Sequence, residues 1–194
     1  MDSDLAEAVA ALKDIFARRG IAARFEKAEP AAIDELKKAL RLPARYRAFL
    51  AAADPVDVET STPVEKVRLF ASSKIAGEQQ VGTNGEALPG WRKSWVVIAR
   101  SALLGDPYFL DVSKLDAEGD CPVYTCMLGT DSLKPELCAS SFQQFLRILA
   151  TSMEVATGFG ESGLDDDDEA IFREALAPKI KTIDSAALRA GHWT

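Results

Sequence analysis

The sequence predicts a fold that mixes helices with a sheet, because its apolar residues follow two different periodicities. Near both ends of the chain they recur every three or four residues, which is typical of amphipathic helices. In the middle, the short apolar runs Trp95–Ile98 and Tyr108–Val112 flank a connection that carries Gly105, Asp106 and Pro107. This arrangement is typical of two neighbouring strands around a polar turn. At 194 residues the chain is long enough for one domain with an appendage.

Three helices are expected in the N-terminal third of the chain. The first ends near Gly20, a residue suited to a helix C-terminus, and the next two begin at Pro30 and Pro43, because proline is tolerated in a first helical turn. The three apolar stripes consist of Leu5, Val9, Leu12 and Phe16, then Ile33, Leu36 and Leu40, then Tyr46, Phe49 and Leu50.

The middle of the chain is expected to hold loops and strands. Residues 54–63 carry two prolines and several acidic or hydroxyl residues, so we interpret them as a loop whose carboxylates are candidates to face a partner. Strands are expected around Val67–Leu69, more weakly over residues 74–81, where Gly77 interrupts the pattern, and over residues 121–128. A long loop leads to Trp91.

The C-terminal part begins with a clear helix signal. Ser141 and Gln144 form a capping box, followed by an apolar stripe that should end by Gly158 or Gly160. Residues 158–168 look like a boundary, because glycines precede a run of aspartates. One short helix should then stop before Pro178, and another should follow, capped by Asp184 or Ser185. We therefore expect a domain over residues 1–157 and an acidic linker with a short helical appendage over residues 158–194.

The composition restricts the partners. The formal charge is −7, and the pI is about 4.9. A nucleic-acid ligand is disfavoured because phosphates require a basic surface, whereas a basic protein partner fits an acidic chain. The sequence shows no signal peptide and no apolar run long enough to cross a bilayer, so neither secretion nor membrane insertion is expected. The three cysteines fit free thiols in a reducing cytoplasm.

The order of three motifs resembles the SMI1/KNR4 superfamily, also called SUKH, over roughly residues 26–150. The first motif leads from a leucine-proline step to a phenylalanine-leucine step, the second is a glycine-aspartate step that enters a strand ending in aspartate, and the third opens the helix after residue 141. They are carried by Leu42, Pro43, Tyr46, Phe49 and Leu50, by Gly105, Asp106, Tyr108, Leu110 and Asp111, and by Ser141, Phe142, Phe145 and Leu146. The chain departs from the family pattern at residues 51–55, where Ala-Ala-Ala-Asp-Pro replaces a glycine-containing turn.

This resemblance implies an α+β domain with a mostly antiparallel sheet packed by helices, here with extra N- and C-terminal helices. It implies a function without chemistry: bacterial relatives resemble immunity proteins that neutralise toxins, many of them nucleases. Fungal relatives resemble regulators of cell-wall synthesis. Our first hypothesis is an immunity protein that occludes the active site of a basic toxin, and the alternative is a regulatory or scaffold module for an endogenous partner. Neither hypothesis requires a cofactor.

No catalytic or metal-binding residue is expected. His192 is the only histidine and lies near the C-terminus, where chains usually fray. The cysteines lack the spacing of a zinc site and are better interpreted as small core residues. Asp106 and Asp111 are too far apart along an extended strand to act as an acid–base pair.

The residues that we expect to contact the partner are acidic, apart from one tryptophan. Carboxylates suit a basic protein, and a tryptophan in a loop is a natural interface anchor. The candidates are Asp57, Glu59, Glu78, Trp91, Asp106, Asp165, Asp166, Asp167 and Asp168.

Structural alternatives stay open for several of these candidates. Burial in the core is the competing interpretation for Trp91, and a role in setting the turn competes for Asp106. The run Asp165–Asp168 also fits a solvated linker and a helix N-terminus, where negative charge is favourable.

Overall fold

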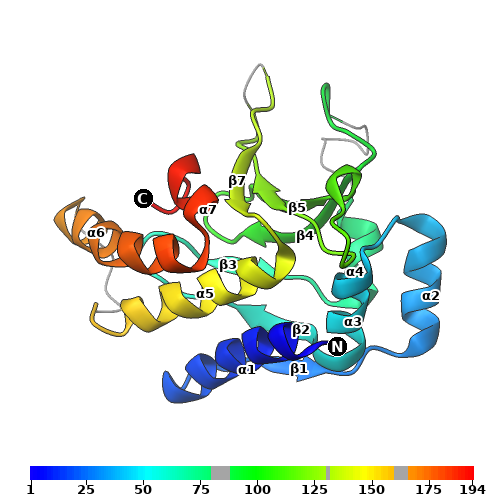
Figure 1. The fold of residues 1–194 in the computed structure, drawn as a ribbon, viewed down its shortest axis with the longest axis horizontal. Coiled ribbons are helices and arrows are strands. Elements are labelled where there is room, and N and C mark those ends of the chain that lie inside the picture. The colour runs from blue at the N-terminus through cyan, green and yellow to red at the C-terminus, as the bar shows by residue number, and fades with distance from the viewer. Residues whose placement is uncertain (80–87, 130–131, 160–165) are drawn as a thin grey trace.

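An antiparallel sheet is the centre of the computed structural model, which describes residues 1–79, 88–129, 132–159 and 166–194 (Figure 1). Within these residues the sheet has seven strands, and their order across the sheet is their order along the chain. Each strand pairs with the next in antiparallel orientation. The strands are β1 (Arg24–Glu26), β2 (Asp54–Glu59), β3 (Val67–Leu69), β4 (Trp95–Ser101), β5 (Pro107–Asp111), β6 (Val123–Thr125) and β7 (Glu136–Ala139). The α+β fold is therefore confirmed.

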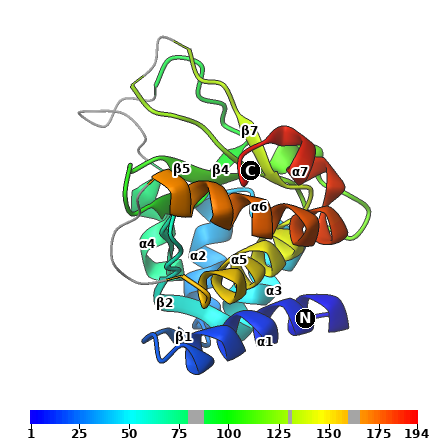
Figure 2. The same cartoon turned by 90° about the vertical axis from the view of Figure 1, so that its left-hand side faces the viewer.

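Helices pack against the sheet, and further helices lie at both ends of the chain. They are α1 (Ser3–Arg18), α2 (Pro30–Ala39), α3 (Ala44–Ala53), α4 (Ser72–Glu78), α5 (Phe142–Ala156), α6 (Asp166–Ile183) and α7 (Ser185–Ala190), with a 3₁₀ turn η2 (Val112–Lys114). Helix α5 lies between α1 and α6, as Figure 2 shows, and α7 packs against β7. Helix α2 packs against α3 and α4. The helices outside the family resemblance are thus in contact with α5 and the sheet.

The predicted strand pair β4–β5 sends its side chains to both faces of the sheet. Tyr108 packs against Phe145 of α5, with ring centroids 5.5 Å apart. Its neighbour Phe109 points to the opposite face and stacks on Trp95 at 4.7 Å. All four side chains are buried. Alternate residues of one short strand therefore fill two layers of core, as a strand with both faces covered requires.

The predicted cap of α5 by Ser141 is confirmed, but the Gln144 side chain accepts from Ser141 Oγ and donates to the Ile183 carbonyl, and no bond to Ser141 N closes the capping box among the described residues. The start of α5 also has a second, distant partner. Ser141 Oγ accepts a hydrogen bond from Gln144 N at 3.1 Å. The carboxylate of Asp120 also accepts bonds from the Phe142 and Gln143 amides, at 2.9 and 3.3 Å, although Asp120 is fully buried. Arg45 lies 3.7 Å from this carboxylate and offsets part of its desolvation cost.

The predicted loop over residues 54–63 is wrong for Asp54–Glu59, which form strand β2, whereas residues 60–63 belong to the β2–β3 connection. Pro55 is tolerated there because it lies opposite Phe25 of the short strand β1, beside an irregularity in the register. Asp57 is exposed, Val58 is buried and Glu59 is half-buried. Asp57 and Glu59 therefore share the outer face of β2. The strands β1 and β7 were not predicted.

The predicted weak strand over residues 74–81 is also wrong, because Ser72–Glu78 form helix α4. The cap of α4 comes from β2: the Asp54 carboxylate accepts bonds from Ser72 N at 2.7 Å and from Ser72 Oγ at 2.6 Å. Just after α4, the Gln79 side-chain amide bonds to the backbone N–H and C=O of Val97 in β4. The end of α4 is therefore bound to strand β4 through the side chain of Gln79, and not through backbone pairing as a strand would be.

Two expectations about the C-terminal part need correction. Helix α6 does not stop before Pro178 but continues to Ile183. Phe172, Leu176 and Ile180 are fully buried along α6, whereas Glu174, whose carbonyl lies four residues before the proline, is exposed and can bond to water. The C-terminus does not fray either: Trp193 is buried, and its indole N–H donates to the Cys138 carbonyl at 2.8 Å. The helix over Asp184–Ala190 is confirmed as α7, and Asp184 is its cap.

Candidate functional site

The structure brings three of the predicted partner-binding residues to one groove. Asp57 and Glu59 of β2 and Glu78 of α4 line a cavity of about 460 Å³, together with Arg68 of β3 and Lys74 of α4. We call this cavity the ladder groove. The sequence did not predict that Glu78 lies near Asp57, because residues 74–81 were expected to form a strand and not helix α4. The groove therefore depends on the packing of α4 against β2.

The carboxylates of the ladder groove are paired with arginines, two of them across neighbouring strands and the third between α4 and β4. Asp57 lies close to its cross-strand neighbour Arg24, at 2.8 Å, and Glu59 lies opposite Arg68, at 2.7 Å. Arg68 in turn faces Arg100, which pairs with Glu78 at 3.2 Å. The side chains of Asp57, Glu59 and Glu78 remain 72%, 37% and 35% exposed. Ion pairs at such exposure contribute little to stability, so these carboxylates can exchange partners at low cost.

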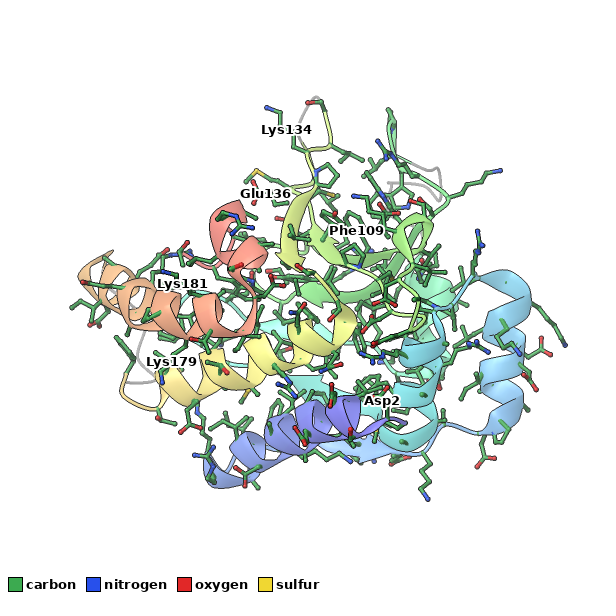
Figure 3. All side chains as sticks on the ribbon, viewed as in Figure 1. Asp2, Phe109, Lys134, Glu136, Lys179 and Lys181 are labelled. Atoms are coloured by element: carbon green, nitrogen blue, oxygen red, sulfur yellow. The ribbon has the colours of Figure 1, made fainter. Side chains whose placement is uncertain are left out.

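A second groove lies where three connections and the C-terminal segment meet at the end of the sheet, and we call it the sheet-end groove. Its volume is about 530 Å³. The contributing segments are the β2–β3 connection, the β4–β5 turn, the chain between β6 and β7, and the C-terminus. Figure 3 shows Lys134 on the segment that leads into β7 and Glu136 at the start of that strand. The residues used below are Glu65, Leu104, Asp106, Tyr108, Met127, Lys134, Glu136 and His192, all of which line it.

Hydrogen bonds fix the floor of the sheet-end groove. Glu65 accepts from Ser101 Oγ at 2.9 Å, from Lys66 N at 2.7 Å and from Tyr108 OH at 3.1 Å. The Tyr108 oxygen also lies 3.1 Å from His192 Nε2. A chain of polar contacts thus joins the C-terminal segment, strand β5 and the β2–β3 connection.

The charges in the sheet-end groove are perturbed by burial. Desolvation raises the pKa of Glu65, and the nearby carboxylate of Asp106 adds to this effect. Burial likewise raises the pKa of Tyr108 well above its ordinary value. Burial, with a smaller contribution from Arg173, lowers the pKa of His192 to about 4. At neutral pH the histidine is therefore neutral and Tyr108 keeps its proton, so the proton of Tyr108 is available to Glu65.

Asp106 is the one predicted partner-binding residue in the sheet-end groove. Its Oδ1 accepts from Leu128 N at 2.8 Å, which joins the β4–β5 turn to the chain after β6. Its backbone carbonyl accepts from Ser101 N at 2.8 Å and closes the turn. The predicted role in the turn is present, and the side chain also faces the cavity. Asp111 lies at the end of β5, where its carboxylate accepts from Ser113 N and Oγ.

Trp91 and the aspartate run lie outside both grooves as far as the structure describes them. Trp91 is half-buried, with its ring edge-on to Trp95 and Phe109 at 5.1 Å. Asp165 lies outside the described residues. Asp166 and Asp167 begin α6, and the Asp168 side chain is exposed.

Sequence reasoning missed Glu65, Tyr108, Glu136 and His192 as members of one site. No periodicity or motif marks this set, because its members come from four segments that only the sheet brings together. Within the described ranges, no group of three or more histidine, cysteine or acidic side chains is placed to hold a metal ion. Nor does any helix of the described chain combine the length and apolarity needed to cross a membrane.

Comparison with known proteins gives one family match. The model of the SMI1 / KNR4 family (SUKH-1) matches residues 27–148. No curated protein matches the chain. The matched region includes β2 to β7, α2 to α4 and the first part of α5, and therefore every lining residue named for the two grooves except His192.

Proposed function

Because the chain belongs to the SMI1/KNR4 family (SUKH-1), we propose that it is an immunity protein that binds a cognate bacterial toxin and neutralises it by occluding the toxin's active site. The family is associated with immunity proteins, which act by binding. Nucleases are a suitable toxin class, because an enzyme that holds nucleic acid presents basic residues that carboxylates can contact. The free, buried cysteines of the described chain support a reducing compartment, and we place the action in the cytoplasm.

One observation carries this proposal: one exposed and two half-buried carboxylates, those of Asp57, Glu59 and Glu78, gather along the ladder groove. Each is held by an arginine of the same surface, so the groove is ordered before a partner arrives. A basic toxin can replace those arginines by its own lysines and arginines while the net charge of −7 accelerates the encounter. The mechanism is then steric occlusion with electrostatic complementarity, and it needs no chemistry from this chain.

The proposal is tested with the product of an adjacent toxin-like gene. Cells that express this toxin should survive when the full chain is co-expressed, and the purified pair should form a tight complex. The variant Asp57→Asn/Glu59→Gln/Glu78→Gln should weaken binding by about tenfold or more and reduce rescue. A matched control is Asp14→Asn/Glu35→Gln/Glu169→Gln, whose carboxylates are paired with cations on their own helices.

The control variant should bind within about threefold of the wild type, since it removes the same charge away from the groove. Raising the salt concentration should lower the association rate of the wild type more than that of the groove variant. Absence of both rescue and binding would overturn the proposal. Equal losses in the two triple variants would show that net charge acts without this groove. Binding to an endogenous protein together with failure to rescue would favour a regulatory or scaffold module.

A further inference from the structure

We propose that the sheet-end groove receives a lysine side chain from a protein partner, with the methylene stem of that lysine lying on Leu104 and Met127. This inference deepens the proposed function by naming the chemistry of the contact, and it rests on that function only in taking the partner to be a protein.

The groove offers negative charge that the described chain does not neutralise. Glu65, Asp106 and Glu136 line it, and none of them forms an ion pair within residues 1–79, 88–129, 132–159 and 166–194. Lys134 stands at the rim without pairing with them. The carboxylates of the ladder groove, in contrast, all have arginine partners. Charge complementarity therefore favours a cation in the sheet-end groove.

The walls of the groove favour a cation on an apolar stem. Leu104 is 74% exposed and Met127 is 63% exposed, and both line the same cavity as the carboxylates. Large apolar side chains left this open become favourable contacts when a partner removes them from water. A lysine carries four methylene groups below its ammonium, so it can lie along such walls while its charge reaches the carboxylates.

The acceptors that remain favour lysine over arginine. The two oxygens of Glu65 provide about four acceptor positions, and three are taken by Ser101, Lys66 and Tyr108. The Oδ1 atom of Asp106 is engaged by Leu128 N. The flat fork of a guanidinium binds best when it meets both oxygens of one carboxylate, whereas an ammonium directs three N–H groups to separate acceptors. The partly occupied carboxylates of Glu65 and Asp106 therefore suit an ammonium.

The test uses three short peptides and the full chain labelled with ¹³C at its methionine methyl groups. The probes are acetyl-Ala-Leu-Lys-Leu-Ala-amide and its norleucine and arginine counterparts. The chain has three methionines, so the spectrum is simple, and Met127→Leu identifies the groove signal. Met153 is fully buried and reports whether the fold is intact, while Met1 is exposed away from the groove lining and reports non-specific contact.

The lysine peptide should shift the Met127 signal in a saturable way. Its Kd should be on the order of 1 mM, because one side chain supplies few contacts. The norleucine peptide should bind about tenfold more weakly, since it keeps the stem and lacks the charge. Glu65→Gln should weaken lysine binding by about fivefold, whereas Glu174→Gln, an exposed change on α6, should leave it unchanged.

Three results would overturn the inference. They are equal binding of the lysine and norleucine peptides, tighter binding of the arginine peptide, and absence of a Met127 shift while Met153 shows a folded protein. No toxin enters this experiment. A failed rescue assay therefore leaves the lysine site standing, and a failed peptide titration leaves the immunity function standing.

Discussion

Among single residues, Trp193 shows that a side chain near the C-terminus can contribute to the stability of the core. It is buried, it donates to the Cys138 carbonyl, and its ring lies 6.4 Å from that of Phe145. We expect Trp193→Ala to lower the free energy of unfolding by about 3–5 kcal/mol, since a large aromatic is lost and a buried carbonyl loses its donor. Urea denaturation measures this loss. The control Thr194→Ala, at an exposed neighbour, should stay within about 0.5 kcal/mol of the wild type.

The pH dependence of stability should carry the signature of His192. Its pKa is lowered to about 4 in the folded chain against 6.5 for an unperturbed histidine, so the unfolded state binds the proton more tightly. The stabilisation is present above pH 6.5 and is lost as the pH falls towards 4. Between pH 7 and pH 5 the wild type should therefore lose about 2 kcal/mol relative to His192→Gln.

The comparison with His192→Gln is needed because Glu65 changes stability in the opposite sense. Its raised pKa makes its contribution greatest at low pH, and that contribution is lost as the pH rises through the folded-state pKa. Both proteins contain Glu65, so its effect cancels in the difference between their urea midpoints. A difference that does not change with pH would contradict the assignment of a neutral, buried histidine.

At the scale of elements, the turn that precedes β6 depends on one glycine. Gly119 has a φ of +74°, and a Cβ placed there would lie 2.8 Å from the Cβ of Ala44 at the start of α3. Gly119→Ala should therefore destabilise the protein by about 2 kcal/mol or more, through strain and through displacement of α3. Thermal unfolding monitored by circular dichroism measures the change.

The control for Gly119 is Gly77→Ala in helix α4. Nothing lies within 4 Å of a Cβ at Gly77, and its backbone is helical. This exchange should stabilise the protein by about 0.5–1 kcal/mol, because alanine is the better helix former. A loss of stability at Gly77, or none at Gly119, would contradict the conformations described for these two elements.

The elements also show which parts of the fold can be predicted from sequence. Helices α5 and α7 were predicted because their caps, Ser141 and Asp184, lie next to them in the chain. Helix α4 was missed because its cap is Asp54, 18 residues earlier in the chain, and a local pattern cannot include that contact. Strand β2 was missed because Pro55 and the acidic residues indicated a loop, whereas pairing with β1 and β3 decided the structure.

The candidate site was predictable only in part for the same reason. The outward position of Asp57 and Glu59 follows from alternation along one strand once β2 is known. Glu65 and His192 carry no such signal, because each contributes to the sheet-end groove through a contact with Tyr108 that spans 43 or 84 residues. A site whose residues come from several connections can be recognised only once the arrangement of the strands is known.

For the whole molecule, the matched family region depends on helices outside it. Leu5, Leu12 and Phe16 of α1 and Phe172 and Leu176 of α6 are buried, and both helices pack on α5. We expect a fragment of residues 27–157 to lack a cooperative unfolding transition, because the apolar sides of α5 would face water. Near-ultraviolet circular dichroism should show fixed aromatic packing in the full chain and its absence in the fragment. A fragment with native-like packing would show that the added helices are dispensable.

The strand order described above also bears on how the chain acquires its structure. In a meander in which every strand pairs with its immediate successor, most pairings close short stretches of chain, so the entropy lost at each step is small. A nascent chain can therefore add strands one after another in the direction of synthesis. Tyr108 must wait, however, because His192, which contacts its hydroxyl, lies 84 residues further along the chain. The sheet can form during translation, while the wall that His192 contributes to the sheet-end groove is added only after the segment of 84 residues from Tyr108 to His192 has been synthesised.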